Sequence, residues 1–206
     1  IPLLQTFEEL KQDGIEFKLT MSMTPPLVSM LRDSFLQERY DNHLAKLQEL
    51  AAKELQHNAN NGHLQYLAQH YINQFARVRQ TWEKHNRDLV TAFKAFQESN
   101  NLEIITSAAT HGYLPLMKMY PEAVRAQIEI ACNHYEENFG CSPRGIWLPE
   151  CAYYDGLERF MADAGLRYFL MDGHGILYAS PRPRYGTYAP IYTETGVAAF
   201  GRDHES

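Results

Sequence analysis

The stretch that decides the fold is Gly145-Ile146-Trp147-Leu148-Pro149-Glu150-Cys151-Ala152-Tyr153, an apolar run followed by a proline and a carboxylate. Residues 144–148 have the pattern of a short buried strand. Pro149 cannot donate to a strand ladder, so the strand should end there and Glu150 should follow its carboxyl end. In α/β sheets this edge binds ligands. The stretch predicts a site around Glu150, with a solvated loop glutamate as the alternative.

Polar side chains follow other predicted strands in the same way. Strands are expected near residues 17, 104, 146, 169 and 198, separated by helices or long excursions, which is typical of parallel strands with crossovers. The polar residues that come after these strands are His111, Glu150, Asp172, His174, Arg202 and Asp203. Because parallel strands end at one edge, we expect these groups to converge there. The predicted fold class is α/β, with a parallel-stranded barrel or barrel-like sheet.

The chain between the first two strands is predicted to be a helical insertion. Alternation over residues 15–23 predicts the first strand, and residues 27–100 have the apolar spacing of long helices with a break at 58–62. We therefore expect residues 1–26 to start the barrel, residues 27–100 to form an inserted helical hairpin, and residues 101–206 to continue the barrel. The aromatic stripe of the insertion is interpreted as core packing, and its five histidines as surface residues.

Composition excludes several classes of partner. The formal net charge is −6 with basic residues scattered along the chain, which argues against nucleic acid and against an anionic membrane surface. No apolar run approaches the ~18 residues of a spanning helix, and no secretory signal is visible. The three cysteines lack zinc-site spacing and are expected to be reduced, which favours a cytoplasmic protein without metal or cofactor.

Two segments resemble motifs of glycoside hydrolase family 57. Residues 146–153 resemble the nucleophile motif of that family, and residues 106–115 (Thr-Ser-Ala-Ala-Thr-His-Gly-Tyr-Leu-Pro) resemble its preceding motif. Among family members, the chain is most similar to the 1,4-α-glucan branching enzymes, which act in glycogen biosynthesis. The resemblance implies an incomplete (β/α)7-type barrel and an α-1,4-glucan such as amylose or glycogen as substrate.

The resemblance also implies roles for individual residues. Glu150 would be the nucleophile of a retaining mechanism, which needs two carboxyl groups about 5–5.5 Å apart. The family's acid/base Asp belongs to a later motif, expected beyond Ser206, and its first His-containing motif would precede Ile1. Both ends therefore look cut, and the 206 residues alone are expected to be inactive. The other predicted substrate-binding residues are His111, Trp147, Asp172, His174, Arg202 and Asp203.

The same residues are compatible with several alternative functions. Within the same family, the reaction could be hydrolysis, as in an α-amylase, or 4-α-glucanotransfer. A metal-dependent polysaccharide deacetylase would use His111, Asp172, His174 and His204 as ligands. A glucan-binding protein without catalysis is a further alternative. Cys151 could be proposed as a nucleophile, but a small packing residue is the favoured interpretation.

Overall fold

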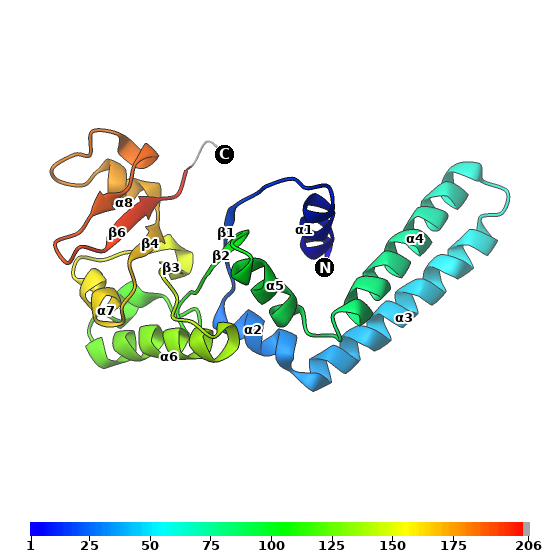
Figure 1. The fold of residues 1–206 in the computed structure, drawn as a ribbon, viewed down its shortest axis with the longest axis horizontal. Coiled ribbons are helices and arrows are strands. Elements are labelled where there is room, and N and C mark those ends of the chain that lie inside the picture. Colours follow the sequence, from blue (N-terminus) through cyan, green and yellow to red (C-terminus); the bar gives the residue numbers. More distant parts are fainter. Residues whose placement is uncertain (204–206) are drawn as a thin grey trace. The chain divides into compact units, whose positions relative to one another are not determined.

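The computed structural model describes residues 1–203, and the chain divides into two compact units (Figure 1). The helical unit consists of Ile1–Lys18 and Ser29–Asn101, and the sheet unit consists of Leu19–Val28 and the chain from Leu102 onward. His204, a ligand in the deacetylase alternative, lies outside the described residues. No helix within residues 1–203 has both the length and the apolar character needed to cross a bilayer.

The helical unit contains the predicted hairpin. Its helices are α1 (Pro2–Gln12), α3 (Ser34–His57), α4 (Gly62–Lys84) and α5 (Leu89–Glu98), while α2 (Pro25–Arg32) crosses from one unit to the other. α3, α4 and α5 each begin after an Asp or Asn whose side chain accepts a backbone N–H (Asp33, Asn61 and Asp88). Such caps satisfy donors that the first helical turn leaves without a partner. α3 and α4 run side by side as an antiparallel pair (Figure 1).

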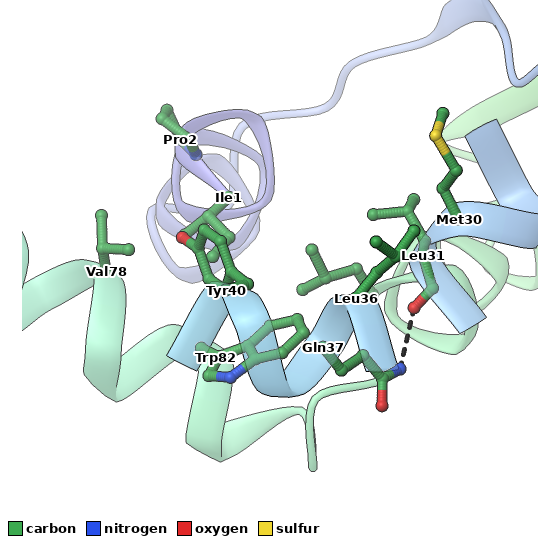
Figure 2. A pocket seen from close by; sticks show the side chains of 10 residues that line it. Ile1, Pro2, Met30, Leu31, Leu36, Gln37, Tyr40, Val78 and Trp82 are labelled. Carbon is green, nitrogen blue, oxygen red and sulfur yellow. Dashed lines mark hydrogen bonds between the residues drawn. The ribbon is translucent and has the colours of Figure 1, made fainter. Parts of the chain in front are cut away.

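Aromatic and charged side chains hold α3 against α4. The edge of Tyr40 packs on Trp82, with ring centroids 5.0 Å apart. Asp41 accepts hydrogen bonds from the indole N–H of Trp82 (2.9 Å) and from Arg79 (2.7 Å). Figure 2 shows that Tyr40 and Trp82 also border an apolar pocket of about 280 Å³ within the helical unit, where the Gln37 side-chain amide donates to the Leu31 carbonyl. Trp82 is buried, as the core-packing interpretation of the aromatic stripe predicts, whereas Tyr71 of the same stripe is 49% exposed and departs from it.

The start of the chain differs from the prediction. The predicted strand over residues 15–23 is shorter, and β1 covers only Leu19–Ser22. Phe17 instead stacks on Phe7 of α1, with ring centroids 5.3 Å apart, and Phe7 also contacts Phe96 of α5 at 5.6 Å. This aromatic cluster places residues 1–18 in the helical unit rather than with the strands.

The prediction that all histidines of the insertion are surface residues was wrong for His85. Its Nε2 lies 2.8 Å from Oε1 of Glu8, and both side chains are mostly buried. Burial alone would raise the pKa of Glu8, but hydrogen bonds from Lys84 and His85 outweigh it and lower the pKa. The partner comes from α1, so no spacing within the insertion could show it.

The sheet unit is built on parallel strands. Its strands are β1 (Leu19–Ser22), β2 (Leu102–Ile105), β3 (Gly145–Trp147), β4 (Tyr168–Met171), β5 (Ile191–Tyr192) and β6 (Ala198–Gly201). β1 pairs with β2, and β3, β4 and β6 follow one another, all in parallel. A parallel bridge between Thr106 and Ile146 connects β2 to β3. The predicted parallel order is confirmed, but the short antiparallel β5 was missed.

One face of these strands forms the core. The register places Ile146, Phe169 and Ala199 next to one another on neighbouring strands. These side chains pack in one buried cluster with residues of α6 (Pro121–Phe139), α7 (Leu157–Asp163) and α8 (Gly173–Leu177). α6 begins with Pro121 in its first turn and ends at Gly140, whose φ of 76° is in the left-handed region. Helices covering parallel strands confirm the α/β class.

Candidate active site

Four loops of the sheet unit carry the predicted site residues. They follow β2, β3, β4 and β6, which are parallel, so all four leave the sheet at its carboxyl edge. The first loop holds His111 and continues into η1 (Leu114–Met117), and the second holds Glu150 within the short turn η2 (Pro149–Cys151). After β4, Asp172 caps α8 and His174 lies in the first turn of that helix, and Arg202 and Asp203 follow β6.

The backbone at Glu150 is strained. Glu150 has φ 52° and ψ 24°, and the next residue, Cys151, has φ 56°. Left-handed conformations are uncommon for residues other than glycine. Each costs of order 1–3 kcal/mol, so it persists only where the surrounding structure enforces it. Here the Cys151 N–H donates to the Leu148 carbonyl (2.8 Å), and the Ala152 N–H donates to the Pro149 carbonyl (3.1 Å). The turn projects the Glu150 side chain into solvent, with 72% of it exposed.

His111 faces this carboxylate. Its Nε2 lies 3.5 Å from Oε1 of Glu150, and 45% of the His111 side chain is exposed. His111 also has a positive φ, 56°. Two strained residues from successive loops therefore present an imidazole and a carboxylate to the same open space. An exposed carboxylate with an adjacent imidazole can form hydrogen bonds to a bound polar ligand or attack an electrophilic carbon.

Ser107 contacts the candidate site, and the sequence pattern did not single it out. Its side chain is buried, and its hydroxyl donates to the Trp147 carbonyl at 2.9 Å. The same oxygen lies 3.4 Å from Nδ1 of His111. Ser107 thus connects β3 to the imidazole that faces Glu150. The sequence feature that could have identified Ser107 is its place in the His111 motif, directly after a predicted strand.

Trp147 lies beside the Glu150 turn. It occupies the face of β3 opposite the buried Ile146, and its indole Nε1 lies 3.3 Å from the Cys151 sulfur. Cys151 is buried, as expected for a packing residue. The Cys151 carbonyl accepts the N–H of Asp172 at 2.8 Å, so the Glu150 turn is also tied to the loop after β4.

Asp172 and His174 form a second pair at this edge. The carboxylate of Asp172 accepts both the backbone N–H of His174 (2.9 Å) and its imidazole Nδ1 (2.6 Å). The imidazole lies parallel to the exposed ring of Tyr178, with 10° between the planes and 6.2 Å between the centroids. The Asp172 carboxylate therefore fixes the orientation of an exposed imidazole. Nε2 lies on the other side of that ring from the Nδ1 atom that Asp172 binds.

Arg202 and Asp203 are exposed and continue beyond β6. The N–H of Arg202 donates to the Met171 carbonyl at 2.8 Å, which places it beside the start of the Asp172 loop. The structure thus joins His111 to Glu150 and Asp172 to His174 through their side chains, and it joins these two pairs and Arg202 through backbone contacts.

Metal ligands do not gather among the described residues. Within residues 1–203, no three His, Cys, Asp or Glu side chains form a group that could hold a metal ion. His111 of the deacetylase alternative faces Glu150 instead of joining Asp172 and His174. The donor set of that alternative is therefore not assembled in the described part of the chain.

Comparison with known proteins places these motifs in one family. The model of glycosyl hydrolase family 57 matches residues 1–205. The 1,4-alpha-glucan branching enzyme TK1436 of Thermococcus kodakarensis is 33% identical over 233 aligned residues, which cover 100% of this chain and 34% of the relative.

Two solved structures have the same fold. The alpha-amylase AmyC of Thermotoga maritima superimposes with a TM-score of 0.94 at 43% identity, covering 99% of this chain and 39% of that protein. The branching enzyme of Pyrococcus horikoshii gives a TM-score of 0.92 at 32% identity, covering 99% and 41% respectively. This chain therefore spans between 34% and 41% of the length of these relatives.

Proposed function

The chain belongs to glycosyl hydrolase family 57, and on this premise we propose that it supplies the nucleophile and part of the substrate-binding surface of an α-glucan transferase. The observation that carries the proposal is the pairing of Glu150 with His111 at the exposed edge of the parallel strands, 3.5 Å apart. Aromatic and polar side chains beside this pair suit a sugar chain, whose rings have apolar faces and hydroxyl edges.

Glu150 is proposed to act as the nucleophile of a double displacement. A carboxylate oxygen attacks the anomeric carbon of an α-1,4-linked glucose, the bond to the leaving sugar breaks, and a covalent glycosyl ester forms. An acceptor hydroxyl then displaces Glu150, so the product keeps the α configuration. His111, 3.5 Å from Glu150, is placed to bind a hydroxyl of the same sugar or to orient the nucleophile.

The remaining predicted residues are proposed to bind the glucan. Trp147 lies against the Glu150 turn through Cys151, and Asp172 with His174 forms the adjacent polar pair. Arg202 and Asp203 extend the same edge after β6. These roles fit the family resemblance, and each remains a proposal for the individual residue.

A second carboxyl group is needed as proton donor. We propose that it comes from a part of the enzyme outside these 206 residues, and that the chain alone does not catalyse transfer. The share of the relatives that this chain spans, between 34% and 41%, supports this proposal. The parallel order β1-β2-β3-β4-β6 likewise supports an incomplete (β/α)7-type barrel.

Branching is the proposed reaction, with a glucan 6-hydroxyl as acceptor and glycogen synthesis in the cytoplasm as the context. The support comes from relatives named as branching enzymes, which match nearly the whole chain at 32% and 33% identity. Hydrolysis is the second candidate because the structure named as an alpha-amylase is 43% identical. Both reactions use the same glycosyl ester and differ in the acceptor that reaches it.

The experiment uses the enzyme expressed from its complete reading frame with amylose as substrate. Glu150→Gln should abolish turnover while binding of amylose remains. In the wild-type enzyme, a peptide containing Glu150 should carry a glycosyl ester after rapid acid quenching. Turnover in the variant would exclude the nucleophile role. Branch counting and the iodine spectrum of the product then separate the reactions, because branching creates 1,6 links whereas hydrolysis releases reducing ends.

A further inference from the structure

A buried carboxylate lies just beyond the Glu150 turn. Glu158, in the first turn of α7, is only 6% exposed. Its Oε2 accepts hydrogen bonds from the hydroxyl of Tyr153 (2.7 Å) and from the backbone N–H of Gly156 (3.0 Å). A carboxylate is rarely buried unless its acceptors are satisfied, because removing it from water is costly. Nothing in the proposed chemistry uses Glu158, so its burial needs another explanation.

Tyr153 is the side chain that Glu158 holds. Its ring stacks on Phe169 of the core, with centroids 5.4 Å apart and 9° between the planes. Burial, followed by the hydrogen bond to Glu158, raises the pKa of Tyr153, so its hydroxyl stays protonated and keeps donating. Tyr153 is therefore fixed by the core on its ring face and by a carboxylate at its tip.

Tyr153 and Glu158 lie close in the chain to the strained residue Glu150. Tyr153 follows the two left-handed residues Glu150 and Cys151 after a single residue. Such strained residues persist only when the surrounding structure over-determines them, so contacts that fix the flanking chain support the turn. On one side, the turn is anchored by the Leu148 and Pro149 carbonyls, which accept N–H groups of the turn. On the other side, the next anchored side chain is Tyr153, held by Glu158.

We propose that Tyr153 and Glu158 are positioning residues that hold the strained Glu150 turn in the conformation that presents the carboxylate to His111. The inference rests on the proposed function of Glu150 as nucleophile. Neither side chain is assigned contact with the reacting sugar. Both act through the backbone of residues 150–156, so loosening them should misplace the nucleophile while leaving the glucan-binding side chains of the other loops in position.

The test measures kcat and KM for amylose in the enzyme expressed from its complete reading frame. Tyr153→Phe keeps the ring stack and removes only the hydrogen bond to Glu158. The matched control is Tyr135→Phe, because the buried Tyr135 hydroxyl donates to the Ile104 carbonyl at 2.7 Å and its ring packs on Phe139. Both variants lose one tyrosine hydrogen bond in the same unit, so their melting temperatures should fall by similar amounts.

Only Tyr153→Phe should lower kcat, by roughly tenfold to a hundredfold with KM nearly unchanged, since small misplacements of a reacting group have effects of this size. Glu158→Gln keeps an acceptor oxygen and should retain far more kcat than Glu158→Ala. Should Glu158→Ala fail to fold, Tyr153→Phe and Glu158→Gln still decide the question. A kcat for Tyr153→Phe equal to that of Tyr135→Phe overturns the inference.

Glu150→Gln, measured in parallel, separates the positioning role of Tyr153 from the nucleophile role of Glu150. An inactive Glu150→Gln together with an unaffected Tyr153→Phe overturns the positioning role alone. An active Glu150→Gln overturns the nucleophile role, and the positioning role falls with it. The supporting result is an inactive Glu150→Gln with a selective loss of kcat in Tyr153→Phe.

Discussion

The imidazole Nε2 of His111 lies 3.5 Å from the carboxylate Oε1 of Glu150, and both residues have left-handed backbone conformations. The two side chains come from loops that follow neighbouring strands, since Thr106 and Ile146 form the bridge between β2 and β3. Ser107 contacts both loops through the Trp147 carbonyl and the His111 ring. The order of the strands therefore brings these two residues together.

Replacing His111 with Asn should lower kcat/KM for amylose by roughly tenfold to a hundredfold, because the group proposed to orient Glu150 or the sugar is lost. Asn tolerates the left-handed backbone that His111 adopts, so the loop should keep its shape. The melting temperature should hardly change because the side chain is 45% exposed. His63→Asn, at an exposed position of α4, is the control, and equal kinetics in both variants would contradict the role.

Asp172 and His174 should contribute differently, Asp172 to the stability of the fold and His174 to glucan binding. Asp172→Asn keeps a side-chain oxygen that can cap α8, so stability should be maintained, whereas Asp172→Ala should cost about 1 kcal/mol of cap energy. His174→Ala should weaken binding of a maltooligosaccharide roughly fivefold, the value of about one hydrogen bond. Titration calorimetry measures the binding and thermal unfolding the stability. Unchanged affinity in His174→Ala would remove His174 from the substrate surface.

Cys132 should make stability fall in alkaline solution. Burial, with the nearby Glu129 and Glu136 charges, raises the pKa of its thiol from 9.0 to about 11. The folded state thus binds the thiol proton more tightly than the unfolded state does. The resulting contribution of Cys132 to the free energy of unfolding is fully present below pH 9.0 and is lost as the pH rises to about 11. Melting temperatures of wild type and Cys132→Ala at pH 8 and pH 11 check this. The variant should lose less stability between the two values, and an equal loss would contradict the prediction.

In the helical unit, Asp41→Ala should be strongly destabilising. Asp41 is 15% exposed in its side chain, accepts hydrogen bonds from Trp82 and Arg79 and forms an ion pair with the exposed Arg87. Its removal leaves the mostly buried Trp82 and Arg79 donors without their acceptor. We expect a loss of about 2–3 kcal/mol in the free energy of unfolding, measured by urea denaturation. The control is Glu49→Ala, which removes an exposed pair with Lys53 on the same helix and should cause no measurable change. Similar midpoints for both variants would contradict this account.

The sequence predicted most elements of the sheet unit because their signals are local. The bounds of α6, the proline that ends the Trp147 strand and the polar residues after each strand could all be read from neighbouring residues. Errors arose where a distant partner decided the outcome. Phe17 leaves the predicted strand to pack on Phe7 and Phe96, and His85 is drawn to Glu8 of α1. β5 is only two residues long, which is too short for periodicity to show.

The sequence by itself determined the α/β class, the helical insertion and the identity of the polar groups that follow the parallel strands, because periodicity, prolines and motifs are properties of neighbouring residues. Only the tertiary structure decided that His111 faces Glu150, that Ser107 and Trp147 lie behind them, and that Glu158 holds Tyr153. Distances of a few ångströms between loops depend on strand register and on strained backbone angles, and residues far apart in the chain set both.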